Sequence, residues 1–83
     1  MKNDEFTRKV SNASEMVFSV NGKRFTVCDE DEKGISIAQW HRQDTERYFA
    51  SAESLVNEYQ IDGKPVAEWA ESIRIEDYTG FDE

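Results

Sequence analysis

The sequence predicts an α+β domain in which an antiparallel sheet of four to five strands carries two helices on one face, in the order ββββααβ. Three observations support this prediction. From residue 16 onwards apolar and polar residues alternate, as they do in half-buried strands. Two later stripes repeat apolar residues at i, i+3, i+4 and i+7, the spacing of amphipathic helices. The 83 residues are enough for one domain.

The N-terminal segment, residues 1–14, is polar and carries a weak helical stripe that includes Phe6 and Val10. This pattern predicts a flexible segment or one short helix. We expect the single domain to span residues 15–78. Residues 79–83 then form an acidic C-terminal tail.

Two alternating runs meet at Asn21-Gly22. Asn-Gly is the strongest short-range hairpin signal, because both central residues of a type I′ turn need a positive φ. A two-residue loop places Phe18 opposite Phe25, and the same register gathers the other large apolar side chains on one face. Turn chemistry and alternation therefore predict the same hairpin.

The next part of the chain predicts two more strands. Residues 29–34 are a charged loop, and residues 35–40 alternate as a third strand. Residues 41–46 are polar and predict a turn. Residues 47–50 then predict a short fourth strand.

The two helical stripes follow this fourth strand. Ser51 is an expected N-cap for a helix that carries Ala52, Leu55, Val56 and Tyr59 on one face. Asp62-Gly63 ends this helix, and Pro65 suits the first position of a second one. The second stripe runs to Ile73, where alternation resumes and predicts a short last strand.

The charge of the chain is strongly negative, at −8 from 10 basic and 18 acidic residues. Residues 29–83 hold five basic and fifteen acidic side chains, a net of −10. Such a surface repels nucleic acid and anionic membranes, so an electrostatic partner should be basic. The sequence has no long apolar run, no signal-peptide pattern and a single cysteine, Cys28, from which we expect a cytoplasmic location.

One motif resembles the start of a calcium-binding loop. Asp29 and Asp31 stand at positions one and three, and a glycine stands at position six. Position five, however, is Lys33, a cation where an oxygen ligand is needed, and position twelve is Trp40 where a bidentate Glu is required. We therefore expect no metal site, and interpret the cluster as a solvated turn or a patch that faces a partner.

No pattern of catalytic or cofactor-binding residues is present. Cys28 and His41 lack the sequence context of a nucleophile and its base. The four glycines are isolated, so no phosphate-binding loop is formed. A domain of this size also has little packing to give up for a deep cavity. We expect neither a catalytic site nor a cofactor.

The acidic residues are the feature with functional content. If the helices gather them on one side, they form a single negative surface, next to an exposed aromatic side chain of the kind found in binding hot spots. Solubility alone is the alternative explanation of the charge. The candidate partner-binding residues are Asp29, Glu30, Asp31, Glu32, Trp40, Glu68, Glu71, Glu76 and Asp77.

The stretches Phe18-Ser-Val-Asn-Gly-Lys-Arg-Phe25, Tyr48-Phe-Ala-Ser-Ala-Glu-Ser-Leu55 and Tyr59-Gln-Ile-Asp-Gly-Lys-Pro-Val66 give residues 16–76 a resemblance to small phage and mobile-element proteins. That class includes anti-CRISPR inhibitors. The resemblance implies a compact acidic α+β protein that occupies the nucleic-acid surface of an effector, and it assigns no residue a role.

These observations favour a non-enzymatic inhibitor whose acidic surface docks on a basic, nucleic-acid-handling protein and mimics nucleic acid. The alternative is a small structural or regulatory subunit, including an immunity-type partner of a toxin, that binds through a sheet edge and exposed aromatic side chains. Salt-insensitive binding that is lost on Trp40→Ala would favour the alternative. The sequence leaves the oligomeric state open.

Overall fold

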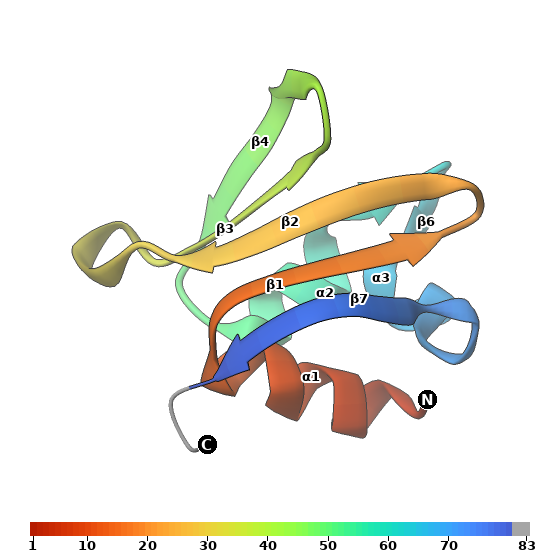
Figure 1. The fold of residues 1–83 in the computed structure, drawn as a ribbon, viewed down its shortest axis with the longest axis horizontal. Helices are drawn as coiled ribbons and strands as arrows, with labels where there is room; N and C mark the ends of the chain where they lie inside the picture. The colour runs from red at the N-terminus through yellow and green to blue at the C-terminus, as the bar shows by residue number, and fades with distance from the viewer. Residues whose placement is uncertain (81–83) are drawn as a thin grey trace.

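The computed structural model describes residues 1–80 and confirms the α+β class. A five-stranded antiparallel sheet has the order β4-β3-β2-β1-β7, and the helices lie on one side of it (Figure 1). The helices are α1 (Asn3–Asn12), α2 (Ala52–Glu58) and α3 (Val66–Trp69). The strands of the sheet are β1 (Ala13–Val20), β2 (Lys23–Asp29), β3 (Ile35–Gln39), β4 (Arg42–Phe49) and β7 (Arg74–Gly80).

The hairpin of β1 and β2 has the register that the sequence predicts. Asn21 and Gly22 both take positive φ, at 52° and 77°, as a type I′ turn requires. Phe18 pairs with Phe25, and Val20 pairs with Lys23. The large apolar side chains of both strands therefore face the helices.

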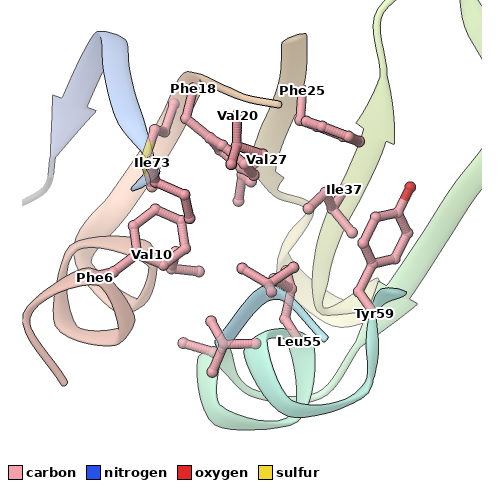
Figure 2. Close-up of a cluster of buried hydrophobic side chains, with 14 of the residues drawn as sticks. Phe6, Val10, Phe18, Val20, Phe25, Val27, Ile37, Leu55, Tyr59 and Ile73 are labelled. Atoms are coloured by element: carbon pink, nitrogen blue, oxygen red, sulfur yellow. The ribbon is translucent and has the colours of Figure 1, made fainter. Parts of the chain in front are cut away.

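Aromatic rings contact one another in series through the centre of the core (Figure 2). The ring of Phe18 lies between Phe6 of α1, edge-on at 5.3 Å, and Phe25 of β2, stacked at 5.3 Å. Phe25 in turn meets Tyr59 edge-on at 6.3 Å. These rings join α1, the central strands and the end of α2, and Phe6 and Val10 place the N-terminal helix inside the same core.

The last described strand ties the two ends of the chain together. β7 pairs with β1, and the Tyr78 hydroxyl donates a hydrogen bond to the carbonyl of Lys9 in α1 at 3.1 Å. Of the expected tail, residues 79–83, Thr79 and Gly80 belong to β7, and residues 81–83 lie outside the described part of the chain. β7 is thus longer than the short last strand that the sequence predicts.

Helix α2 begins as expected. The Ser51 hydroxyl accepts a hydrogen bond from the Ser54 amide at 3.1 Å, which satisfies one of the free N–H groups of the first turn. Leu55 and Val56 are buried against the sheet, and Tyr59 follows the helix as a buried residue.

The fourth strand is longer than predicted, and its turn is shorter. The sequence predicts a polar turn over residues 41–46, but β4 begins at Arg42, and only Trp40 and His41 separate it from β3. His41 allows this by taking a positive φ of 63°. β4 is an edge strand, and its residues are largely exposed on both sides. Its sequence is therefore polar throughout and lacks the alternation that marks a half-buried strand.

The region after α2 also differs from the prediction. Asp62-Gly63 does not simply end the helix: it forms a second hairpin turn with φ of 52° and 85°, between β5 (Gln60–Ile61) and β6 (Lys64–Pro65). Pro65 is the N-cap of α3 and not its first residue. The second helix is also shorter, because α3 is one turn that continues as the 3₁₀ turn η2 (Ala70–Ser72).

The loop between β2 and β3 requires a glycine. It contains the 3₁₀ turn η1 (Asp31–Lys33) and ends at Gly34, with φ of 98°. A Cβ at this position would lie 2.3 Å from the carbonyl oxygen of Phe49, so only glycine lets the loop pass the end of β4.

The two type I′ turns are joined by one carboxylate. Asp62 accepts a hydrogen bond from the Asn21 side-chain amide at 2.6 Å and forms an ion pair with Lys23. These two donors hold the pKa of Asp62 below its usual value. The contact connects the hairpin of β1 and β2 to the hairpin of β5 and β6.

We predict that Phe18→Ala lowers the free energy of unfolding by about 3–5 kcal/mol, because it opens a cavity between two rings and removes buried apolar surface. Urea unfolding followed by far-UV circular dichroism measures the loss. Val17→Ala, on the opposite face of β1, is the control and should cost far less. Equal losses would show that Phe18 is not the centre of the core.

We predict that Asp62→Asn lowers stability at neutral pH and makes it less sensitive to acid. The folded-state pKa of Asp62 is lowered, so its stabilising contribution is complete above the unfolded-state pKa of about 3.9 and is lost as the pH falls through the folded value. Thermal unfolding between pH 7 and pH 2 should show the two proteins converging in acid. Glu68→Gln is the control, and a constant difference at every pH would contradict the role of the Asp62 charge.

Candidate functional site

The outer face of the sheet is the side that points away from the helices. Residues that are directly paired across strands share a face, so the register defines it. Small and polar side chains predominate on this face, and none of the helices in residues 1–80 covers it. Its paired members are Glu15, Val17, Ser19, Arg24, Thr26, Cys28, Ser36, Ala38, Tyr48, Arg74, Asp77 and Thr79.

Two aromatic side chains are exposed here. Trp40 is 40% exposed and Tyr48 is 43% exposed, and they are the large hydrophobic residues left open to solvent in the described chain. The indole N–H of Trp40 donates a hydrogen bond to the Thr26 hydroxyl, and its backbone N–H donates to the carbonyl of Arg24 at 2.9 Å. The ring is therefore fixed in place before any partner binds.

Carboxylates surround the middle of the outer face. Burial raises the pKa of the Cys28 thiol, and the negative charges of Glu15, Glu30 and Glu46 raise it further. The thiol also lies 3.8 Å from a carboxylate oxygen of Glu15. Because the thiol stays protonated at neutral pH, it is a poor nucleophile.

The β7 side of the outer face carries two more carboxylates. Asp77 pairs with Val17, and a register shift next to this pair leaves Glu76 as an extra residue in β7. The Ser19 hydroxyl donates a hydrogen bond to Glu76 at 2.6 Å, which orients this carboxylate over the neighbouring strand. Both side chains belong to the predicted partner-binding set.

The structure does not gather the predicted acidic residues into one helical surface. Asp29, Glu30, Asp31 and Glu32 lie in the loop between β2 and β3, at one end of the molecule (Figure 1). Glu68 and Glu71 lie on α3 and η2, on the helical side at the other end. β1 pairs antiparallel with both β2 and β7, so β2 and β7 end at the same end of the sheet, next to the acidic loop. α3 and η2 come just before the start of β7 and therefore lie at the opposite end.

Several residues of the outer face are absent from the predicted partner-binding set: Glu15, Glu46, Tyr48 and the cations near the aromatic rings. Glu15 is the polar neighbour of Met16 at the start of an alternating run, so alternation could have placed it outward. The position of Tyr48 could not be found in this way, because it depends on the pairing of β4 with β3.

The structure does not bring Cys28 and His41 together. Cys28 pairs with Ser36, while His41 lies beyond the other end of β3, about 16 Å along the sheet by strand spacing. Within residues 1–80, no group of three or more His, Cys, Asp or Glu side chains could hold a metal ion. The described helices also include none that is long and apolar enough to cross a membrane.

The chain was compared with protein-family models, with curated proteins and with solved structures, and none of them matches it.

We predict that Thr26→Val lowers the free energy of unfolding by about 0.5–1.5 kcal/mol, since it removes the hydrogen-bond acceptor of the Trp40 indole and leaves the size of the side chain unchanged. Urea unfolding measures the change. Thr26→Ser keeps the hydroxyl and is the matched control. If Thr26→Ser costs as much as Thr26→Val, the hydrogen bond does not hold the indole.

Proposed function

We propose that this protein is a non-enzymatic inhibitor that docks on a basic, nucleic-acid-handling protein in the cytoplasm and competes there with nucleic acid. The outer face of the sheet carries the interaction. One observation supports this proposal above the others: a sheet face that no helix of residues 1–80 covers presents two exposed aromatic side chains among carboxylates. This is the role that the resemblance to small phage inhibitors implies.

The charge of the outer face suits a basic partner. Five carboxylates lie on it or at its rim, from Glu15, Glu30, Glu46, Glu76 and Asp77. Three basic side chains, from Arg24, Lys33 and Arg74, leave a net of −2, which is five minus three. The chain as a whole is at −8, so its long-range field has the same sign. Opposite charge on the partner accelerates encounter and makes affinity fall with salt.

The aromatic side chains supply the part of the interaction that salt does not screen. A rigid, half-exposed indole buries a large apolar area and loses little conformational entropy on binding. Trp40 has this form because Thr26 fixes its ring. Charge would then attract the partner, and the contact with Trp40 would set the lifetime of the complex.

A second function is favoured by a different observation. β4 is an edge strand in which every residue is exposed or half-exposed, and β3 is the strand that pairs with it within residues 1–80. The side chains of Arg47 and Tyr59 donate hydrogen bonds to the carbonyls of residues 44–46, and a further strand would have to replace those contacts that lie on the free edge. An exposed edge can accept a further strand. This geometry suits a structural, regulatory or immunity-type subunit that binds through β4 and the neighbouring aromatic side chains, and such binding should tolerate salt.

Two charge-reversal pairs test the proposed function. Glu46→Lys with Asp77→Lys changes the outer face, whereas Glu68→Lys with Glu71→Lys changes the helical side by the same charge. Each tagged protein is used to capture partners from nuclease-treated lysate at low and high salt, and the bound proteins are identified by mass spectrometry. We expect the outer-face pair to lose a salt-sensitive, nucleic-acid-binding partner, while the helical pair retains much more of it.

Added nucleic acid should displace the captured partner, because the two are proposed to compete for one surface. Far-UV circular dichroism confirms that both variants fold. If the helical pair abolishes capture and the outer-face pair does not, the docking surface is on the helical side. Capture that resists salt and added nucleic acid, and that is lost on Trp40→Ala, would instead support the subunit function.

A further inference from the structure

Four aromatic rings of this protein lie against Lys or Arg side chains of the same chain. Arg24 lies over the ring of Trp40 at 4.8 Å, and Lys33 lies over Tyr48 at 6.0 Å. Two more such contacts occur elsewhere, Lys64 over Trp69 at 4.3 Å and Lys9 over Tyr78 at 5.2 Å. A cation within about 6 Å of the ring centroid is attracted by the ring quadrupole, and all four contacts fall within that range.

The two rings of the outer face differ from the other two in their exposure. Trp40 and Tyr48 are exposed, whereas Trp69 and Tyr78 are half-buried. Lys33 belongs to the charged loop between β2 and β3, and the side chain of Arg24 is itself exposed. Either cation can therefore move off its ring without disturbing the core.

We propose that the outer face binds an arginine-rich extended segment of its partner, whose guanidinium groups stack on Trp40 and Tyr48 in place of Arg24 and Lys33. This binding mode rests on the proposed function, because it takes the outer face as the docking surface. The excess of carboxylates attracts such a segment and repels the phosphates of a nucleic acid.

The backbone positions of the two aromatic residues suit an extended chain. Tyr48 pairs with Ser36, and Trp40 follows Ser36 by four residues just beyond β3, so the two positions are about 13 Å apart along the strand direction and are displaced sideways by the strand spacing. Side chains at i and i+4 of an extended peptide share a face and have the same separation. Between the two rings, β3 contributes only the small outward side chains of Ser36 and Ala38.

Arginine fits these rings better than lysine does. Its guanidinium is planar and weakly hydrated, so it stacks on an aromatic ring and can still donate paired hydrogen bonds to a carboxylate. Near Tyr48 such a carboxylate is available, because Glu46 lies 3.5 Å from the tyrosine hydroxyl. A lysine offers charge without the planar contact.

Defined peptides test this inference on the full chain at low ionic strength. The probe is a nine-residue peptide with arginines at positions 1, 5 and 9 and neutral polar residues elsewhere. One matched peptide has lysines at the same positions, and another has its three arginines adjacent. Isothermal titration calorimetry gives the affinities. We expect the spaced arginine peptide to bind about fivefold more tightly than either control, the equivalent of one cation–π contact of about 1 kcal/mol.

Variants of the protein locate the contact. Trp40→Leu keeps an apolar side chain but removes the ring, and should weaken binding of the arginine peptide about fivefold. Arg24→Ala frees the Trp40 ring and should strengthen binding of the arginine peptide. We expect this gain to be about threefold larger than that of Arg8→Ala, which removes the same charge from an exposed position of α1. Thermal unfolding shows that each variant is folded.

Two outcomes would overturn the inference. If the three peptides bind equally, and Arg24→Ala has the same effect as Arg8→Ala, binding is electrostatic only. The proposed function would survive that result, because its test uses the charge-reversal pairs and the captured partner. If a single-stranded oligonucleotide binds in place of the peptide, and its binding is lost on Trp40→Leu, the rings stack bases and not guanidinium groups.

Discussion

The burial of Phe18 between Phe6 and Phe25 is the interaction on which the rest of the structure depends. Phe18 belongs to β1, which pairs with both β2 and β7, and its ring contacts α1 on the other side. This one position therefore holds together parts of the chain that are distant in sequence. Because the sheet places its large apolar side chains on the Phe18 side, the helices pack there and the outer face stays in water.

Local chemistry predicts this fold where turn and pattern agree. Asn21-Gly22 stands between two long alternating runs, so both the turn and the register followed from sequence. Asp62-Gly63 has the same chemistry, but its flanking strands are two residues long, and Pro65 favours the start of a helix. The hairpin at Asp62 is thus held by a tertiary contact with Asn21 and Lys23, which periodicity does not reveal.

The candidate site could also be predicted only in part, because it depends on contacts between segments that are distant in sequence. Net charge follows from composition, and Trp40 was a candidate from its place at a strand end, but its exposure is known only from the structure. Which carboxylates accompany Trp40 depends on pairing between strands: Glu76 reaches the outer face beside Ser19, 57 residues away, while Glu68 stays on the helical side. Charge counted along the sequence therefore does not identify the surface on which it gathers.

In this small domain the two faces of the sheet are free to serve different purposes. The apolar residues that fold the chain lie on the helical side, so substitutions on the outer face can alter binding with little effect on the core. The rings of Trp40 and Tyr48 already carry cations in the free protein. A guanidinium from a partner replaces one such contact with another, so the gain at each ring is what that guanidinium adds, planar stacking together with paired hydrogen bonds to a carboxylate. The carboxylates of the outer face and the apolar area covered add to this gain, so the affinity depends on the surrounding charge as well as on the rings.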